Sequence, residues 1–184
     1  MSSVHLHKAV IALRGGGVIA YPTEAVWGLG ADPRNEDACM RLLALKQRPW
    51  QKGLILVASH EDQLAGFIEI PSKTVWRRAA MTWPGPNTWV FPCSEDAPAW
   101  ITGDQDTLAV RISAHETVRA LCDRYGGAIV STSANPAGRE PALSATQVRM
   151  FFQSRIDALV PGALGGLSKP TSIRDAMTGH ILRR

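Results

Sequence analysis

The chain contains little cysteine and no long hydrophobic run. Its 184 residues include three cysteines, Cys39, Cys93 and Cys122, which lie far apart. An odd number of widely spaced cysteines forms neither a disulfide framework nor a paired metal-binding motif, so we expect reduced thiols in a cytoplasmic protein. No stretch approaches the roughly 20 apolar residues that a membrane-spanning helix needs. The first residues also lack the apolar run of a signal peptide, and we expect no membrane association.

Several common catalytic signatures are missing as well. The sequence has no GxxxxGKS or GxxxxGKT motif, so the three glycines at 15–17 are expected to end a helix rather than to cradle a phosphate. It also has no GxGxxG and no GxSxG. The five histidines are scattered without metal-ligand spacing, which predicts no protein-held metal ion. The SAN sequence at 133–135 resembles one element of penicillin-binding enzymes, but the matching SxxK and KTG elements are missing.

The composition is that of a globular protein with enough apolar material for a large core. Hydrophobic residues make up 45% and charged residues 20% of the chain. The length suits a single domain over residues 1–184. The net charge of +4 favours anionic partners such as nucleotides or RNA. The basic residues are dispersed, however, and an ordinary solvated surface of mixed sign explains them equally well.

Alternating periodicities predict an α/β fold built on an open, twisted, mixed sheet with flanking helices. Nearly continuous apolar runs are typical of strands covered on both faces. The expected strands span residues 18–23, 53–59, 88–93, 108–113 and 128–133, with a last strand in the closing HILRR. The expected helices span residues 4–14, 35–46, 74–81, 115–125 and 146–152. The segments at 159–166 and 168–175 are expected to be loops.

Polar residues gather where several of these strands end, which is where open α/β sheets bind ligands. Thr23 and Glu24 follow the first strand, and Gly28 and Gly30 permit a close approach of the backbone. A turn with a threonine hydrogen bond explains the same residues without a ligand.

Three cations fall within seven residues around a proline-fixed turn. Lys46 and Arg48 end a helix and Lys52 precedes a strand. Cations at a helix C-terminus offset the helix dipole by a few tenths of a kcal/mol, which is a purely structural explanation. The same cluster suits a polyphosphate, and the sequence leaves both interpretations open.

Arg111 interrupts an otherwise apolar strand. It shares a strand face with Ala109, whereas Leu108, Val110 and Ile112 share the other. A buried arginine needs an anionic partner. That partner is either a structural Asp or Glu or the carboxylate of a ligand, which the planar guanidinium grips through two hydrogen bonds.

The sequence STSAN at 131–135 places three hydroxyls and an amide after a buried strand. These groups either cap the next turn, or donate hydrogen bonds to phosphate and ligate a metal ion through oxygen. The segment SKPTSIRD at 168–175 is a related polar loop.

Taken in order, these segments resemble the YrdC family of single-domain threonylcarbamoyl-AMP synthases. The matching pieces are YPTEAVWGLGADP, LKQRPWQKGLIL, WPGPNTWVFP, LAVRIS, VSTSAN and KPTSIRDA. Each piece is weak alone, but the ordered set is specific and spans nearly the whole chain. The resemblance implies a YrdC-like sheet curved around a positively charged cavity. It also implies a nucleotidyltransferase that makes L-threonylcarbamoyladenylate and pyrophosphate from L-threonine, bicarbonate or CO2, and ATP with Mg²⁺.

The resemblance further implies partners and site residues. The product would pass to a complex that places threonylcarbamoyl on tRNA, and direct tRNA binding is an open possibility. Lys46 and Arg48 match a catalytic KxR pair at the ATP phosphates. The positions matching threonine-binding residues are Thr23, Arg111, Ser131, Thr171 and Ser172. The remaining positions matching ATP-binding residues are Lys52, Thr107, Ser133 and Asn135.

The sequence departs from the family pattern at three places. Ala25 stands where PTET has a second threonine, and Val57 stands where longer relatives have a histidine. The hydroxyl pair Thr171-Ser172 is reversed. The chain also lacks the additional C-terminal domain of longer members, so closure over the nucleotide is expected to come from a loop.

Two rival functions fit parts of the sequence. A non-catalytic RNA-binding or ribosome-maturation module would use the basic groups for phosphates and Trp27, Trp50, Trp83 and Trp89 for base stacking. A sugar-phosphate enzyme resembling dihydroxybutanone-phosphate synthase would need an acidic metal cluster, and the Asp and Glu residues here are scattered.

Overall fold

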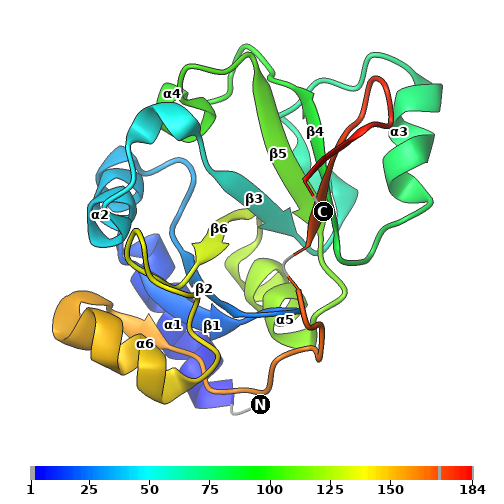
Figure 1. The fold of residues 1–184 in the computed structure, drawn as a ribbon. Coiled ribbons are helices and arrows are strands. Elements are labelled where there is room, and N and C mark those ends of the chain that lie inside the picture. Colours follow the sequence, from blue (N-terminus) through cyan, green and yellow to red (C-terminus); the bar gives the residue numbers. More distant parts are fainter. Residues whose placement is uncertain (1–2, 170, 184) are drawn as a thin grey trace.

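A single mixed sheet organises the part of the chain that the computed structural model describes, residues 3–169 and 171–183. Within these residues the sheet has nine strands in the order β7-β1-β2-β6-β3-β5-β4-β8-β9 (Figure 1). The pairs β1–β7, β3–β5 and β4–β8 are parallel and the others are antiparallel. The predicted open mixed α/β sheet is confirmed.

Most of the predicted elements form within a few residues of their expected bounds. The strands are β1 Ile19–Pro22, β2 Trp27–Gly30, β3 Ile55–Ala58, β4 Asn87–Pro92, β5 Thr107–Ile112, β6 Ile129–Ser133, β7 Ala158–Leu159, β8 Ser172–Asp175 and β9 Ile181–Arg183. The α-helices are α1 Ser3–Arg14, α2 Glu36–Lys46, α3 Lys73–Ala80, α4 Ala99–Thr102, α5 Glu116–Tyr125 and α6 Ala145–Phe152. Short 3-10 turns lie at η1 Trp50–Lys52, η2 Glu61–Leu64 and η3 Gln153–Arg155.

The start of α2 follows local sequence chemistry. Asn35 lies just before the helix, and its Oδ1 accepts a hydrogen bond from the Ala38 amide at 2.9 Å. This satisfies one of the helix's otherwise unpaired first N–H groups. The cap fixes the beginning of the helix that carries Lys46 at its other end.

One strand was not predicted, and one predicted loop is wrong. Residues 27–30 form β2, a strand that the sequence did not indicate and that pairs with β1 and β6. The 168–175 segment contains β8, which pairs in parallel with β4. Short α4 and two-residue β7 were also not predicted. These elements are short, and their pairing depends on distant strands rather than on local periodicity.

The glycines of β2 have a packing reason. A Cβ on Gly30 would lie 2.8 Å from the ring of Tyr21 and 2.9 Å from the Val130 carbonyl. Gly28 likewise lies under the same ring. The close approach that the sequence predicted is therefore made in part by a neighbouring aromatic side chain.

Alternate residues of the central strands face two separate cores. Ile19, Tyr21, Val57 and Ile129 pack in one cluster with residues of α1 and α5. Their chain neighbours, such as Leu56, pack in the larger cluster on the other face. The sheet face that α1 and α5 cover extends along β3, β5 and β6 beyond these two helices. Every second residue of these strands lies on that face.

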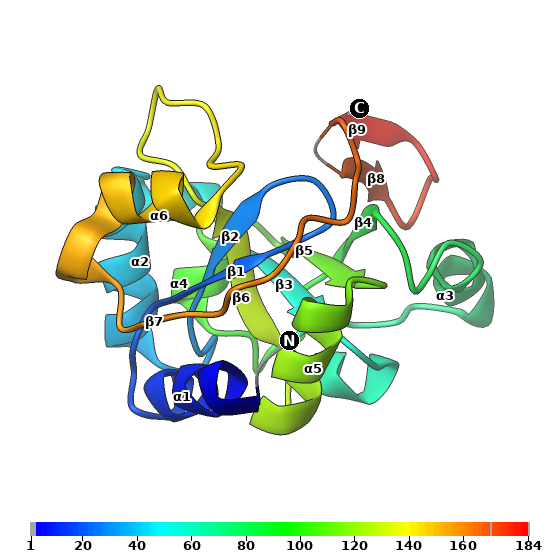
Figure 2. The same cartoon turned by 90° about the horizontal axis from the view of Figure 1, so that it is seen from below.

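The segment between β7 and β8 crosses the molecule. Figure 2 shows it running from the α6 side to the hairpin of β8 and β9. On its way it bonds the β1–β2 turn, where the Gly165 amide donates to the Thr23 carbonyl and the Leu167 amide to the Glu24 carbonyl, each at 3.0 Å. The turn and the C-terminal hairpin, far apart in sequence, are thus joined.

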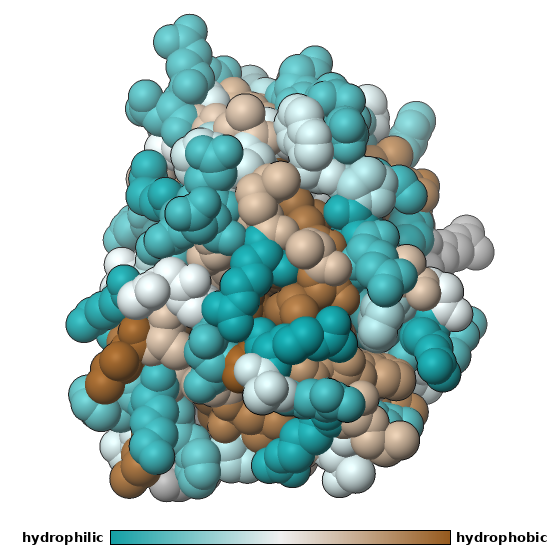
Figure 3. All heavy atoms as spheres, turned by 90° about the vertical axis from the view of Figure 1, so that its left-hand side faces the viewer, coloured by the Kyte–Doolittle hydropathy of each residue, from teal (hydrophilic) through white to brown (hydrophobic). Residues whose placement is uncertain are grey.

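Charged and polar groups dominate the outer surface around scattered apolar ones. On the face drawn in Figure 3, hydrophilic side chains surround and partly cover an apolar area. Within residues 3–169 and 171–183, no helix combines the length and apolar character needed to cross a membrane.

Candidate active site

A cavity of about 450 Å³ lies over the part of the sheet that α1 and α5 leave uncovered. This volume is typical of small-molecule sites. Among the residues predicted to act, it is lined by Thr23, Arg48, Lys52, Arg111, Ser131, Ser133 and Thr171. Several of these residues lie inside strands, so the hollow occupies a sheet face and not only the strand ends expected from the sequence.

Arg111 is held by groups from three different elements. Its side chain is 7% exposed and its Nη1 donates to the hydroxyls of Thr88 at 3.2 Å and Thr171 at 3.0 Å. Its Nη2 lies 3.3 Å from Oε2 of Glu24. The predicted alternation is confirmed, because Ala109 and Arg111 line the cavity whereas Leu108 and Val110 are in the core.

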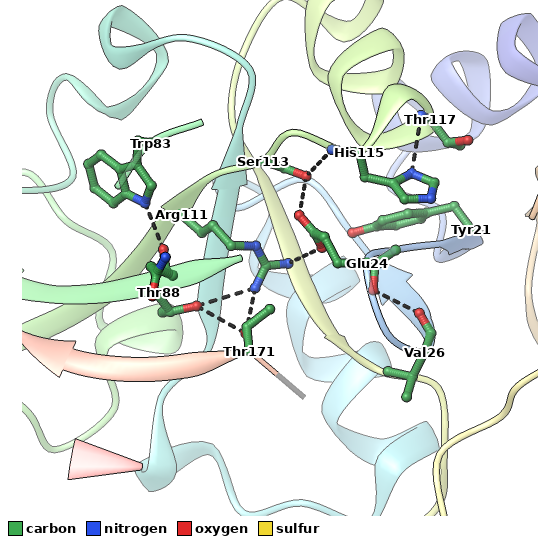
Figure 4. A network of polar contacts seen from close by, with 12 residues as sticks. Tyr21, Glu24, Val26, Trp83, Thr88, Arg111, Ser113, His115, Thr117 and Thr171 are labelled. Carbon is green, nitrogen blue, oxygen red and sulfur yellow. Dashed lines mark hydrogen bonds and ion pairs between the residues drawn. The ribbon is translucent and has the colours of Figure 1, made fainter. Parts of the chain in front are cut away.

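Glu24 is the anionic partner of the buried Arg111. The carboxylate of Glu24 is almost fully buried and forms an ion pair with Arg111 (Figure 4). Its Oε2 is close to Arg111 but lacks hydrogen-bond geometry, so charge rather than direction dominates this contact. Arg111 therefore has a structural counter-ion and still lines the cavity. Its Nε is buried and has no hydrogen-bond partner among the described residues.

Hydroxyl groups form the wall next to Arg111. The Thr23 hydroxyl donates to the Val26 carbonyl at 2.7 Å, which is the turn hydrogen bond expected from sequence, and Thr23 also lines the cavity. The turn hydrogen bond is therefore confirmed, and Thr23 also lies where a ligand in the cavity would meet it. Ser131 is buried on the same face of β6 as Ser133. Ala25 lines the cavity as well, whereas Val57 is buried beneath α5 and contributes nothing to the lining.

Arg48 and Arg183 bring two more guanidinium groups into the cavity lining. Burial, followed by the nearby charge of Arg183, lowers the pKa of Arg48. Burial and the charge of Arg111 lower the pKa of Arg183 in the same way. Together with Lys52 and Arg111, these two residues give the lining four cations. No acidic residue is among those that the structure places in the lining. Such a cluster is electrostatically costly unless an anion joins it.

Lys46 lies below the lining rather than in it. Its ammonium group donates to the carbonyl oxygens of Ser133 and Asn135, the latter at 3.1 Å, and to Oδ1 of Asn135 at 3.2 Å. Burial, followed by the charge of Arg48, lowers the pKa of Lys46 to about 8. The predicted catalytic cation therefore holds the 133–135 loop from beneath.

Three further predicted residues, besides Lys46, lie outside the lining. Asn135 accepts from Ser133 at 2.7 Å and helps to shape the loop. Ser172 donates to Oδ1 of Asn87 at 2.9 Å, away from the cavity. Thr107 is the first residue of β5 and pairs with Pro92 at the far end of that strand from Arg111. The predicted contacts of Ser172 and Thr107 with substrate find no geometric support in this arrangement.

Sequence reasoning missed Arg183 and Thr88. Arg183 reaches the cavity from β9 and donates to the Thr171 carbonyl at 3.1 Å. The only available signal was a cation in the short final strand, which is too common to indicate a site. Thr88 is fully buried inside an apolar strand, and only its contact with Arg111 shows its role.

The RNA-binding alternative needs tryptophans that can stack on bases. Trp27 and Trp89 are 2% and 3% exposed and belong to the core, and Trp83 packs against Trp76 with ring centroids 5.6 Å apart. Of the four tryptophans considered, Trp50 alone is exposed. Residues 3–169 and 171–183 contain no cluster of three or more potential acidic, histidine or cysteine metal ligands.

Comparison with known proteins agrees with this architecture. A family described as "Telomere recombination", which comprises Sua5, YciO and YrdC proteins, matches residues 11–184. The threonylcarbamoyl-AMP synthase of Halorhodospira halophila is 58% identical over 180 residues, covering 97% of this chain and 94% of that protein. The enzyme of the same name from Xanthomonas campestris is 54% identical over 180 residues, with 97% and 96% covered.

Solved structures give the same result. Sua5 of P. abyssi complexed with L-threonine superposes with a TM-score of 0.87 at 34% identity, covering 92% of this chain and 50% of that one. This chain thus spans half the length of that protein. YciO of E. coli has a TM-score of 0.86 at 23% identity, over 97% of this chain and 88% of that one, which supports the fold alone.

The chain folds as an α/β protein whose mixed sheet carries a hollow lined by hydroxyl and guanidinium groups. The chain belongs to the Sua5/YciO/YrdC family.

Proposed function

We propose that this protein is a threonylcarbamoyl-AMP synthase, which forms L-threonylcarbamoyladenylate and pyrophosphate from L-threonine, bicarbonate or CO2, and ATP. One observation carries the proposal. Arg111, a buried carboxylate-binding group beside several hydroxyls, shares one cavity with the guanidinium groups of Arg48 and Arg183. An amino acid and a polyphosphate need these two kinds of group side by side. Relatives more than 50% identical over nearly the whole chain bear the enzyme's name.

The reaction needs alignment more than covalent help from the protein. The threonine nitrogen forms a bond to the carbon of CO2 and loses a proton, which gives a carbamate. A carbamate oxygen then bonds to the α-phosphorus of ATP, the bond from that phosphorus to the bridging oxygen breaks, and pyrophosphate leaves. Reactions of this type depend on positioning and charge neutralisation.

The side chains divide between the two substrates. Arg111, Thr23 and Ser131 would hold threonine, with Thr171 supporting Arg111. Arg48, Lys52 and Arg183 would offset the charge of the triphosphate and of departing pyrophosphate, with Ser133 at the phosphates. Lys46 would act through the 133–135 loop that it binds.

Magnesium would enter as part of the substrate. The described residues provide hydroxyl and amide oxygens near the cavity, which are ligands acceptable to Mg²⁺. The protein's part would be to bind MgATP through the phosphate-facing cations. The product would pass to a tRNA-modifying complex in the cytoplasm, and direct tRNA contact is not needed for the reaction.

The test is threonine-dependent pyrophosphate release by variants of Arg111. Arg111→Ala alone would leave the buried Glu24 carboxylate unpaired, at a cost of about 3–5 kcal/mol in stability. The double variant Glu24→Gln/Arg111→Met removes both charges and keeps the fold testable. We expect it to release pyrophosphate at least roughly 100-fold more slowly than wild type.

A matched control is Arg41→Met. Arg41 pairs with Asp157 at 2.7 Å, outside the cavity lining, so its loss removes an ion pair without touching the site. We expect normal turnover from this variant. Normal turnover from the double variant, with its circular dichroism unchanged, would contradict the proposed threonine site.

A further inference from the structure

We propose that Glu24 is a positioning residue that sets the orientation of the Arg111 guanidinium and thereby makes the site selective for a free α-carboxylate. This inference rests on the proposed function. Glu24 is not among the residues that line the cavity, so it would act through Arg111 and not by touching substrate. Recognition of a ligand carboxylate by Arg111 would then depend on the charge of Glu24, which lies outside the cavity lining.

The geometry gives Arg111 two independent anchors. The hydroxyls of Thr88 and Thr171 accept from Nη1, and the Glu24 carboxylate attracts Nη2 from the other side. Because the guanidinium is planar, fixing both Nη groups fixes the direction in which the remaining N–H donors point. The two hydroxyls alone would hold only Nη1 and would leave the guanidinium plane free to rotate about that atom. The attraction between Nη2 and the Glu24 carboxylate, 3.3 Å away, opposes that rotation.

Glu24 is itself held by groups unrelated to substrate. The Ser113 hydroxyl donates to Oε1 of Glu24 at 2.6 Å, and the His115 amide donates to the same hydroxyl at 3.1 Å (Figure 4). The His115 ring in turn accepts from the Thr117 amide at 3.3 Å, at the start of α5. A chain of buried polar contacts therefore leads from a helix terminus to the cavity wall.

The backbone of Glu24 is fixed as well. The Leu167 amide donates to its carbonyl from the segment that crosses towards β8. That segment continues to Thr171, the second anchor of Arg111. Glu24 and Thr171 therefore lie on two chain segments that are hydrogen-bonded to each other. The fold thus sets the orientation of the Arg111 guanidinium before a ligand binds. Such preorganisation is what second-layer residues supply in precise sites.

The variant that isolates this role is Glu24→Gln. It keeps the size of the side chain and an oxygen for Ser113, but it turns an amide instead of a charge towards Arg111. We expect the KM for L-threonine to rise roughly 10- to 100-fold, which is the usual effect of losing a contact to a charged group. The KM for ATP should change less than about twofold, since among the described residues no ion pair or hydrogen bond joins Glu24 to the phosphate-facing cations Arg48, Lys52 and Arg183.

The decisive readout compares L-threonine with L-threoninamide, which lacks the carboxylate. Wild type should prefer L-threonine strongly, measured as the ratio of kcat/KM values for pyrophosphate release. Glu24→Gln should reduce that ratio roughly 10-fold or more, because it impairs the reading of the carboxylate and not of the rest of the substrate. A purely structural defect would lower both values equally and leave the ratio unchanged.

Two further variants sharpen the test. Ser113→Ala removes the hydroxyl that holds Oε1 and should lower the ratio in the same direction but less. Asp157→Asn removes a carboxylate that pairs with Arg41 away from the site, and its ratio should equal that of wild type. An unchanged ratio in Glu24→Gln, or tighter threonine binding by it, would overturn the inference. If wild type releases no pyrophosphate with threonine, the proposed function itself fails, which is a distinct result.

Discussion

At the scale of single residues, burial tunes the charge of Lys46. Its pKa is lowered to about 8, so the ammonium loses its proton in the folded protein at a pH where the unfolded chain keeps it. Between pH 8 and the ordinary value near 10.5, the unfolded state binds more protons, and the contribution of Lys46 to stability rises with pH. The hold of Lys46 on the 133–135 loop beside the phosphate-facing cations follows the opposite trend, because the protonated ammonium is the stronger hydrogen-bond donor.

This opposition predicts a pH dependence of ATP binding. We expect the KM for ATP to rise as the pH increases above about 8, approaching tenfold per pH unit, while the fold persists. In Lys46→Arg the cation keeps its charge, and the rise should move to higher pH. Initial rates at saturating threonine, from pH 7 to 10, measure both curves. A wild-type KM that stays flat to pH 10 would show that the charge of Lys46 does not act on ATP.

At the scale of elements, the turn between α2 and β3 shows how backbone geometry places the cations. Gly53 has a φ of +63°, and a Cβ there would lie 2.8 Å from the Thr102 carbonyl. Its own carbonyl accepts from Nη2 of Arg48 at 3.0 Å. Only glycine suits this position, and the position of Arg48 depends on it.

Gly53→Ala should therefore destabilise the protein and weaken ATP binding together. Strain and the backbone clash predict a loss of about 2–3 kcal/mol in the free energy of unfolding, measured by urea denaturation. Gly138→Ala is the matched control, since Gly138 also has positive φ, +76°, but nothing within 4 Å of its Cβ position. The control should lose only about 1 kcal/mol and keep its affinity for ATP. Equal losses in both would refute the role given to the Thr102 contact.

The elements also show what the sequence could predict. The predicted helices, such as α2 with its Asn35 cap, have local signals of spacing and capping that the structure confirms. Strands β2 and β8 do not, because each gains its hydrogen bonds from strands remote in the chain. The same limit applies to the site. Strand alternation predicted which face of β5 carries Arg111. The pairing of Arg111 with Glu24 and the position of Arg183 in the cavity lining could not be predicted, because both depend on contacts between segments distant in the chain.

At the scale of the whole molecule, the cavity joins both halves of the chain. Its wall includes Thr23 from the β1–β2 turn, Arg111 from the middle and Arg183 from β9. A ligand in this hollow would contact the β1–β2 turn, β5 and β9 at the same time. Binding should therefore stabilise the entire fold and protect these segments together.

Thermal unfolding tests this coupling. L-threonine with MgATP, each at about 100 times its dissociation constant, should contribute at least about 2.7 kcal/mol. For a protein of this size that corresponds to a rise in Tm of roughly 5–10 °C. Hydrogen exchange should slow at the β1–β2 turn and in β8 and β9 simultaneously. L-Threoninamide in place of L-threonine is the control and should give a smaller rise in Tm, because it offers Arg111 no carboxylate. Protection confined to one of these regions would mean that the ligand does not bridge them.

The position of Arg183 and Thr171 in the wall has a consequence for protein synthesis. A chain leaving the ribosome from its N-terminus exposes Thr23 early, and Arg111 at about the midpoint of translation. The hollow has no complete wall until residues 171–183 have emerged and paired beside β4. A nascent polypeptide can therefore fold much of its sheet while it remains unable to capture its substrates.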